Sequence, residues 1–415
     1  APCRISVNCR FPPAAGPGQG AASAWWLGSR SVEAVRGAVP AQPGCRAPIS
    51  LKFNFDRVFG PGASQGDVYG PVEPLVRGAL NGTSGAVLCY GQTATGKTFT
   101  MEGPSGDTCG ESRGLVQRAF ETLFAAGRDA KVAARVYLSA LEVHMEQLRD
   151  LLQDEENEGE LHIVTDKRGR VQVLGLAEVE VRDAAAALEV FGAARRRRAV
   201  AQTGANDRSS RSHCLLTVRV ERLHTGTSAK LSFVDLAGSE NARNACSKVR
   251  GAGEASRTIP AETKAINRSL TALGLIIRRL AEERPGAAAP GHVPYRISKL
   301  TRLLQDTLNG RAQSVLILHC SPLRSQTAET LSTLRLGSAA SRLPAAPGEH
   351  AAGKPDGKES LAATLQAARV EIQRLRAAHG GGGLPQPSAV QPKCLADVGA
   401  DAIRPPAWSA SKLRG

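Results

Sequence analysis

The stretch Gly91-Gln92-Thr93-Ala94-Thr95-Gly96-Lys97-Thr98 decides how this 415-residue chain folds. It has the spacing G-x-x-x-x-G-K-[ST], it follows an apolar run typical of a strand (residues 86–90), and helix-compatible residues follow it. Glycines in such a turn let backbone N–H groups face inward and form a nest for anions at a helix N-terminus. We therefore expect a phosphate-binding loop in which Lys97 reaches the β- and γ-phosphates and the Thr98 hydroxyl binds Mg²⁺. A glycine-rich turn without such a role is the alternative, and the strand, spacing and helix together disfavour it.

Two polar segments further along the chain have the groups that a sensor of a terminal phosphate needs. The first, Asn206-Asp-Arg-Ser209-Ser210-Arg211-Ser212-His213, directly precedes an apolar strand, although a solvated loop would look the same. The second, Asp235-Leu-Ala-Gly238-Ser-Glu240, follows the apolar run 231–234, so its first carboxylate lies at a strand end and can reach Mg²⁺ through water. Gly238 can donate its N–H to a phosphate because no side chain blocks close approach.

Arg211 and Glu240 are opposite charges on these two segments. An ion pair between them would close the site around an attacking water, and its loss would open the site. The alternative is a surface ion pair worth about 0–1 kcal/mol. We favour the functional interpretation because both residues lie inside the phosphate-sensing motifs.

The composition limits the partners and the compartment. The net charge of +15 indicates an acidic partner, and nucleic acid, an anionic membrane surface and an acidic protein polymer satisfy it equally well. Nine cysteines without a C-x-x-C pair are typical of free thiols in a reducing compartment. There is no apolar run of eighteen residues and no secretory leader pattern, so we expect an intracellular, soluble protein without membrane insertion.

The pattern along the chain predicts one large domain, residues 1–343, followed by a different kind of sequence. From about residue 51 to 343, strand-like runs alternate with helical patterns, as in an α/β sheet covered by helices. We expect a linker at 344–358, a short amphipathic or coiled-coil helix at 359–379 and a disordered tail at 380–415. The helix spans little more than two heptads, so homo-oligomerisation through it alone would be weak. Its a/d positions are Leu361, Leu365, Ala368, Ile372 and Leu375.

Taken together, the motifs resemble the kinesin superfamily over nearly the whole stretch from residue 5 to residue 343. Beside GQTATGKTFTMEG stand NDRSSRSH, VDLAGSE, INRSLTALG, HVPYRISKLTRLLQDTLNG and ETLSTLRLGSAASR, in the family's order. The resemblance implies an α/β P-loop NTPase of the kinesin motor fold, with a central, mostly parallel eight-stranded sheet and three helices on each face. It also implies a microtubule-dependent motor ATPase that uses ATP and Mg²⁺ in the cytoplasm, on the microtubule cytoskeleton, in spindle or centrosome organisation or in transport.

The resemblance further assigns roles by position. Ser209, Ser210 and Arg211 would belong to the first switch, with Ser210 joining Thr98 and Asp235 around Mg²⁺. Asp235, Gly238 and Glu240 would form the second switch, and the helix opened by Asn267 would report the nucleotide state to the track. The nucleotide-binding residues would be Arg10, Pro13, Asn206 and the phosphate-binding loop, namely Gly91, Gln92, Thr93, Ala94, Thr95, Gly96, Lys97 and Thr98.

Four cations are the expected contacts to the acidic tubulin surface, with solvated helix and loop charge as the alternative. They are Arg268, Arg296, Lys299 and Arg302. The run of arginines at residues 195–198 we interpret instead as solvated or as a partner of a helix dipole. We do not expect nucleic acid as a partner, because no aromatic residues interleave with these arginines.

Two departures from the family pattern favour a second hypothesis, a non-motile microtubule-binding regulatory protein with weak ATP turnover. Pro12 replaces the second arginine of the usual adenine-binding R-x-R-P, and supplies neither a cation nor an N–H. The segment between Glu240 and Asn267 is also longer than is typical. Separately, the wording GKTFTMEG, ETKAIN and LGLII is similar to kinesins with a C-terminal motor, which favours minus-end movement.

Overall fold

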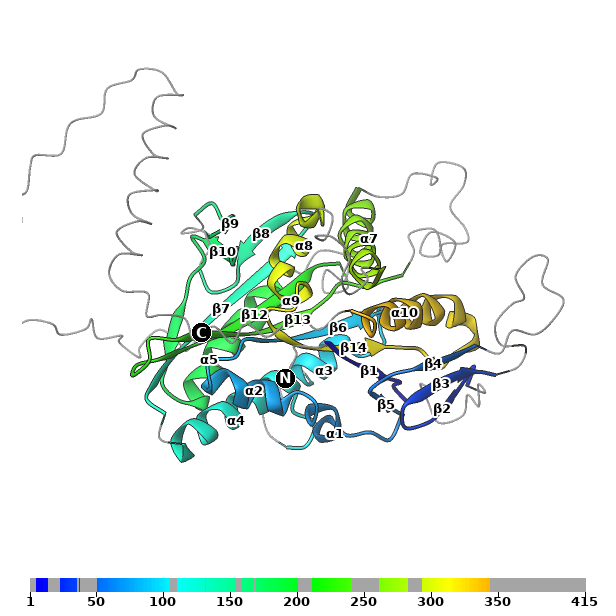
Figure 1. Cartoon of the computed structure of the whole chain (residues 1–415), viewed down its shortest axis with the longest axis horizontal. Coiled ribbons are helices and arrows are strands. Elements are labelled where there is room, and N and C mark those ends of the chain that lie inside the picture. Colours follow the sequence, from blue (N-terminus) through cyan, green and yellow to red (C-terminus); the bar gives the residue numbers. More distant parts are fainter. Residues whose placement is uncertain are drawn as a thin grey trace, which may run out of the picture. The chain divides into compact units, whose positions relative to one another are not determined.

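The computed structural model describes residues 5–13, 23–35, 37, 51–104, 110–130, 132–153, 159–166, 169–200, 211–240, 261–282 and 293–343. The segments predicted at 344–358, 359–379 and 380–415 lie outside these residues, as do Asn206, Ser209 and Ser210 of the first switch. Within the described part, a central twisted sheet lies between two layers of helices (Figure 1).

The central sheet follows a path of eight strands, as the family resemblance implied, with a ninth strand attached at its side. The strands in spatial order are β11 (Val179–Val181), β7 (Ala134–His144), β12 (His213–Arg222), β13 (Ser228–Asp235), β6 (Gly85–Gly91), β14 (Gln313–His319), β1 (Ile5–Arg10) and β5 (Arg57–Phe59). The ninth, β8 (Gln147–Asp150), forms a hairpin with β7.

The direction of the strands divides this sheet into two halves. The four pairings from β13 through β6, β14 and β1 to β5 are parallel, while the three from β11 through β7 and β12 to β13 are antiparallel. The sheet is therefore mixed, with less parallel pairing than we expected. For one of the three antiparallel pairings the reason is the short turn at residues 223–227, because β12 and β13, joined by so few residues, can only pair antiparallel.

Helices cover both faces of the sheet (Figure 1). One face has the main helices α2 (Glu73–Leu80), α4 (Leu115–Asp129) and α5 (Ala184–Val200), together with the short α1 (Gln65–Tyr69) and α3 (Lys97–Glu102). The other has α7 (Ala261–Glu282), the nearly continuous pair α8 (Lys299–Leu303) and α9 (Gln305–Leu308), and α10 (Thr327–Ala340). Three main helical units on each face agree with the fold that the resemblance implied.

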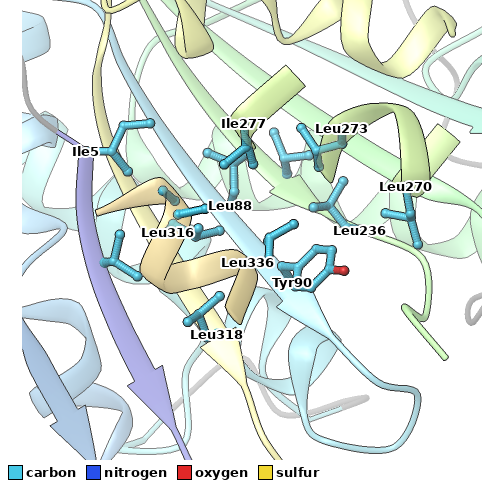
Figure 2. Packing of buried hydrophobic residues seen from close by; sticks show 14 of the residues in the cluster. Ile5, Leu88, Tyr90, Leu236, Leu270, Leu273, Ile277, Leu316, Leu318 and Leu336 are labelled. Carbon is cyan, nitrogen blue, oxygen red and sulfur yellow. The ribbon is translucent and has the colours of Figure 1, made fainter. Parts of the chain in front are cut away.

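The two halves of the core meet across β6, which is buried along its whole length. Because side chains alternate along a strand, Val87 and Cys89 pack toward α2 and α4, while Leu88 and Tyr90 pack toward α7 and α10. Figure 2 shows the second cluster, in which Leu273 and Ile277 of α7 and Leu336 of α10 surround Leu88. Burial on both faces explains why this strand is a continuous apolar run rather than an alternating one.

Smaller elements complete the described structure. Strands β2 (Trp25–Leu27), β3 (Ser31–Ala34) and β4 (Lys52–Asn54) form a separate three-stranded sheet, and β9 (His162–Thr165) pairs with β10 (Val171–Leu174). Two 3-10 turns, η4 (Tyr295–Ile297) and η5 (Arg324–Gln326), precede α8 and α10. None of the helices within the described ranges has the length and apolar content needed to cross a bilayer. The four cysteines described there, Cys9, Cys89, Cys214 and Cys320, are free thiols.

Candidate nucleotide site

The predicted phosphate-binding loop connects the end of β6 to the start of α3, and two glycines give it its shape. Gly91 has φ +150°, and a Cβ there would lie 2.1 Å from the backbone oxygen of His319. Gly96 has φ +89° and directly precedes Lys97, the first residue of α3. Because an L side chain is strained in both conformations, glycine is required at the two positions that the motif fixes.

Lys97 lies inside the loop. Its Nζ donates a hydrogen bond to the backbone oxygen of Gln92 at 2.8 Å, and only 7% of the residue is exposed. Burial lowers the pKa of Lys97, while the charges of Asp235 and Glu240 oppose this shift. The ammonium group is therefore positioned by the loop itself, where a phosphate oxygen could replace the Gln92 carbonyl as its acceptor.

Thr98 and Asp235 form the part of the site that fits a Mg²⁺ ion. The Thr98 hydroxyl donates to Asp235 Oδ2 at 2.8 Å, because Asp235 ends β13 next to the parallel strand β6. The other oxygen, Asp235 Oδ1, is buried and has no hydrogen-bond partner among the described residues. One hydroxyl and one carboxylate, completed by phosphate oxygens and water, are the ligands that Mg²⁺ prefers in nucleotide sites. The third predicted ligand, Ser210, lies outside the described residues.

The second switch contacts the phosphate-binding loop directly. A Cβ at Gly238 would lie 2.2 Å from Thr93 Oγ1, so a larger residue here would displace the Thr93 and Glu240 side chains from their present contacts. Glu240 Oε2 accepts a hydrogen bond from the Thr93 N–H at 2.9 Å, and Glu240 Oε1 accepts from the Thr93 hydroxyl. The Ser239 N–H donates to the Gly91 oxygen at 3.1 Å. The Glu240 carboxylate therefore contacts the loop in this structure, and its ion pair with Arg211, at the start of β12, stays a prediction.

The interpretation of the arginine run at the end of α5 as solvated was wrong for Arg195 and Arg198. Arg198 is 4% exposed, and its Nη1 bonds to Asp235 Oδ2 at 3.1 Å and to Glu102 Oε1 at 3.0 Å. Arg195, one helical turn earlier, pairs with Glu102 Oε2 at 3.0 Å, while Arg196 is exposed. The physical reason is the helical period: residues three apart share a face, and that face is turned toward the buried carboxylates. Arg198 thus fixes the orientation of the Asp235 carboxylate, a role that sequence reasoning missed.

The residues that surround Arg10 were also not predicted from the sequence. Its Nη1 donates to Gln65 Oε1 and to Thr100 Oγ1, both at 2.6 Å, and its guanidinium carbon lies 5.7 Å from the centre of the Phe99 ring. Phe99 is 42% exposed, which is unusual for a large apolar side chain next to a buried cation. Pro13, the other predicted base contact, is exposed three residues beyond Arg10. An exposed aromatic face beside the loop is a surface on which a planar base can stack.

His213 connects three parts of the molecule. It begins β12, its Nδ1 accepts a hydrogen bond from the Ala237 N–H of the second switch at 3.0 Å, and its Nε2 lies 2.9 Å from the Ser269 hydroxyl of α7. Burial, with help from the charges of Arg198 and Lys97, lowers the pKa of His213 to about 3. The ring is therefore neutral, and because Nδ1 accepts, Nε2 carries the proton and donates it to Ser269.

The four predicted track-binding cations lie on neighbouring elements of one face. Arg268 on α7 and Arg296 in η4 are exposed, while Lys299 and Arg302 on α8 are half-buried. These three elements contact one another on the α7–α10 side of the sheet (Figure 1). The amino end of α8 is held by the Lys299 N–H, which donates to Glu146 Oε2 at 2.7 Å across the β7–β8 turn. The structure brings the four cations together, and their role in binding stays a prediction.

A phosphate-binding loop after a parallel strand, with a strand-end carboxylate bonded to its threonine, defines the class of P-loop nucleotide-binding proteins. Residues 41–343 match the family model of the kinesin motor domain. The chain therefore belongs to the kinesin family, and the resemblance found in the sequence is confirmed.

Individual kinesins show the same likeness. The chain is 40% identical over 293 residues to a kinesin-like protein KIN-1 of Oryza sativa subsp. japonica, and 40% over 292 residues to a kinesin heavy chain of Botryotinia fuckeliana. A kinesin-like protein KIN-14E of Oryza sativa subsp. japonica is also 40% identical, over 301 residues. These matches cover 69%, 69% and 71% of this chain, but only 58%, 31% and 26% of the relatives.

A solved structure described as that of a fast kinesin shows the same fold. Its TM-score is 0.68 at 34% sequence identity, over 86% of this chain and 98% of that chain. The kinesin motor fold is therefore established for the described part of the chain.

Proposed function

We propose that this protein is a microtubule-dependent motor ATPase, which hydrolyses ATP to ADP and phosphate and couples that reaction to movement along microtubules. The observation that carries the proposal is the contact between Thr93 of the phosphate-binding loop and the second switch at Gly238 and Glu240. A γ-phosphate bound in the loop would meet these residues first. Its loss would change their contacts, which is the property that a phosphate sensor requires. The motor domain would be residues 1–343.

The described residues divide the work at this site. Lys97 would bind the β- and γ-phosphates, and Thr98 and Asp235 would hold Mg²⁺, with Arg198 fixing the carboxylate of Asp235. Mg²⁺, when bound, neutralises charge on the phosphates and orients them. Arg10, Phe99 and Pro13 would hold the base. Glu240 and Arg211 would close the site around the attacking water. Ser209 and Ser210 would belong to the same first switch as Arg211, with Ser210 as a further Mg²⁺ ligand, and Asn206 would contact the nucleotide.

A continuous set of contacts leads from this site to the proposed track-binding face. The second switch bonds to His213 through Ala237, and His213 bonds to Ser269 of α7. The next residue toward the start of that helix is Arg268, the exposed cation that we expect to contact tubulin. A displacement of the second switch would therefore reach α7 through two hydrogen bonds.

The experiment that tests the proposal is a microtubule-stimulated ATPase assay of the wild-type chain and of Lys97→Ala. We expect stimulation by microtubules in the wild type and a loss of turnover of about 10²- to 10³-fold or more in the variant, because a preorganised cation is removed from the transferring phosphate. Lys52→Ala is the matched control, since Lys52 pairs with Glu33 on the separate small sheet and should leave turnover unchanged. A wild-type ATPase that microtubules do not stimulate would contradict the proposal.

The second candidate is a non-motile, microtubule-binding regulatory protein with weak ATP turnover. Pro12 favours it, because this residue follows Arg10 on the base-binding side and supplies no hydrogen-bond donor. This candidate predicts microtubule affinity that is equal with ADP and with a non-hydrolysable ATP analogue. Gliding of microtubules over the immobilised protein would exclude it.

The direction of movement along microtubules and the cellular role follow from particular motifs and from the family resemblance. We infer minus-end movement from the motifs GKTFTMEG, ETKAIN and LGLII, and a role in spindle or centrosome organisation or in transport. Overall identity does not separate the kinesin types, since KIN-1, kinesin heavy chain and KIN-14E relatives are all 40% identical. Gliding of polarity-marked microtubules measures the direction, and plus-end movement would overturn this inference.

A further inference from the structure

A hollow between α7 and α10 is distinct from the nucleotide site. It has a volume of about 300 Å³. Its lining comes from three elements and one residue after α10: Arg278 and Glu282 of α7, Phe53 of β4, Arg335, Ser338 and Ala339 of α10, and Arg342 just after α10. Residues 278 and 282 are one turn apart on α7, and 335, 338 and 342 follow the same period on α10, so each helix turns one face toward the hollow.

The described residues that line this hollow have a net positive charge. Three guanidinium groups face one carboxylate, and the three arginines are all exposed. Among the residues that the structure describes, no hydrogen bond or ion pair involves the side chain of Arg278, Arg335 or Arg342. Some exposed arginines elsewhere have ion-pair partners, such as Arg77 with Glu73 and Arg170 with Asp166. Like charges gathered without counter-charges repel one another, and a bound anion removes that cost.

We propose that this hollow binds a phosphate monoester dianion. Guanidinium groups present paired N–H donors in a plane that matches phosphate oxygens, and several around one site give both affinity and orientation. The volume is at the lower end of the range for small-molecule sites, which suits one phosphorylated group rather than a long peptide. Phe53 provides an apolar wall for the organic stem, and the Ser338 hydroxyl is a further donor. Glu282 repels anionic groups beyond the first and so favours ligands with a single phosphate.

A ligand in this place would connect α7 to α10. Ile277 and Leu336, which adjoin Arg278 and Arg335 in the sequence, are buried together in the core below (Figure 2). The two helices therefore already pack through their apolar faces, and the anion would join their charged faces. Any movement of α7 relative to α10 would then change the affinity for the ligand, and by reciprocity the ligand would resist that movement.

The test uses the full chain saturated with Mg-ADP, so that the phosphate-binding loop is filled, and phenyl phosphate as the probe in calorimetric titrations at low ionic strength. We expect binding that weakens at least tenfold in Arg278→Gln/Arg335→Gln. Arg279→Gln is the matched control, because Arg279 is exposed on α7 but does not line the hollow, and it should change the affinity less than twofold. Glu282→Gln should tighten binding, an effect of opposite sign that general damage to the fold would not produce.

Three further measurements make the outcome decisive. Unchanged ADP affinity in the double variant shows that it is folded, and phenol in place of phenyl phosphate should not bind. A phosphoserine peptide in a parallel titration distinguishes a phosphorylated side chain from a free small molecule, and binding of either supports the site. Equal affinity of the wild type and the double variant, or loss of probe binding as ADP is raised, would overturn the proposal. None of these measurements depends on ATPase activity, so the proposal of an anion site and the proposal of a motor function are tested independently.

Discussion

Among single residues outside the recognised motifs, Arg198 is the one whose substitution we expect to lower the unfolding free energy most. It is buried between two carboxylates, Asp235 and Glu102. In Arg198→Gln the Asp235 carboxylate loses its ion-pair partner, while Glu102 keeps only Arg195. Breaking a buried pair in this way costs about 3–5 kcal/mol of unfolding free energy. Urea denaturation measures this loss. Arg196→Gln, two residues away but exposed, should stay within about 0.5 kcal/mol of the wild type, and equal losses in the two variants would contradict our assignment.

Arg198 also shows which parts of the site the sequence could predict and which it could not. The phosphate-binding loop was predictable, because its glycines, lysine and threonine are required at fixed spacing by the backbone itself. The partners of Arg198 and Arg10 were not, since Glu102 and Gln65 come from other parts of the chain and only the fold brings them close. The spacing of Arg195 and Arg198 was a signal, because residues three apart share a helical face. A buried carboxylate opposite that face could not be inferred from the run of arginines alone.

At the scale of secondary-structure elements, His213 links β12, the second switch and α7 through a neutral ring, and this makes the link sensitive to acid. Its pKa is about 3 in the folded protein, compared with about 6.5 in an unfolded chain. Between these values the unfolded state binds one more proton, so the stability from the neutral ring is complete above pH 6.5 and is lost as the pH falls toward 3. The loss is about 1.4 kcal/mol per pH unit.

Comparison of the wild type with His213→Asn isolates this effect from the titration of carboxyl groups. Between pH 6.5 and 5, we expect the unfolding free energy of the wild type to fall by about 2 kcal/mol more than that of the variant, measured by urea denaturation at each pH. His224→Asn, at an exposed turn after β12, should keep the wild-type slope. If His213→Asn also keeps that slope, the ring is not held neutral by the fold.

At the level of secondary-structure elements, the motifs alone do not predict the order in which the strands pair. The apolar runs at residues 86–90 and 231–234 lie within β6 and β13, and the apolar strand expected directly after the first switch corresponds to β12. Apolar runs between turn signals identify strands, but they do not say which strands pair. The antiparallel pairing of β12 with β13 follows from the short turn between them. The place of β14 between β6 and β1 requires long crossovers that local patterns do not specify.

In the whole molecule, the fold places part of the net charge of +15 on one face, where cations from α7, η4 and α8 lie on neighbouring elements. If this face binds the acidic microtubule surface, removal of its two exposed arginines should weaken binding. Each exposed pair contributes about 0.2–1 kcal/mol, so Arg268→Gln/Arg296→Gln should raise the dissociation constant roughly 2- to 30-fold and reduce its salt dependence. Cosedimentation with microtubules at two salt concentrations measures both.

Arg128→Gln removes an exposed charge from α4, on the opposite face of the sheet, and should change neither quantity. Similar weakening in both variants would mean that total charge, and not this face, determines binding.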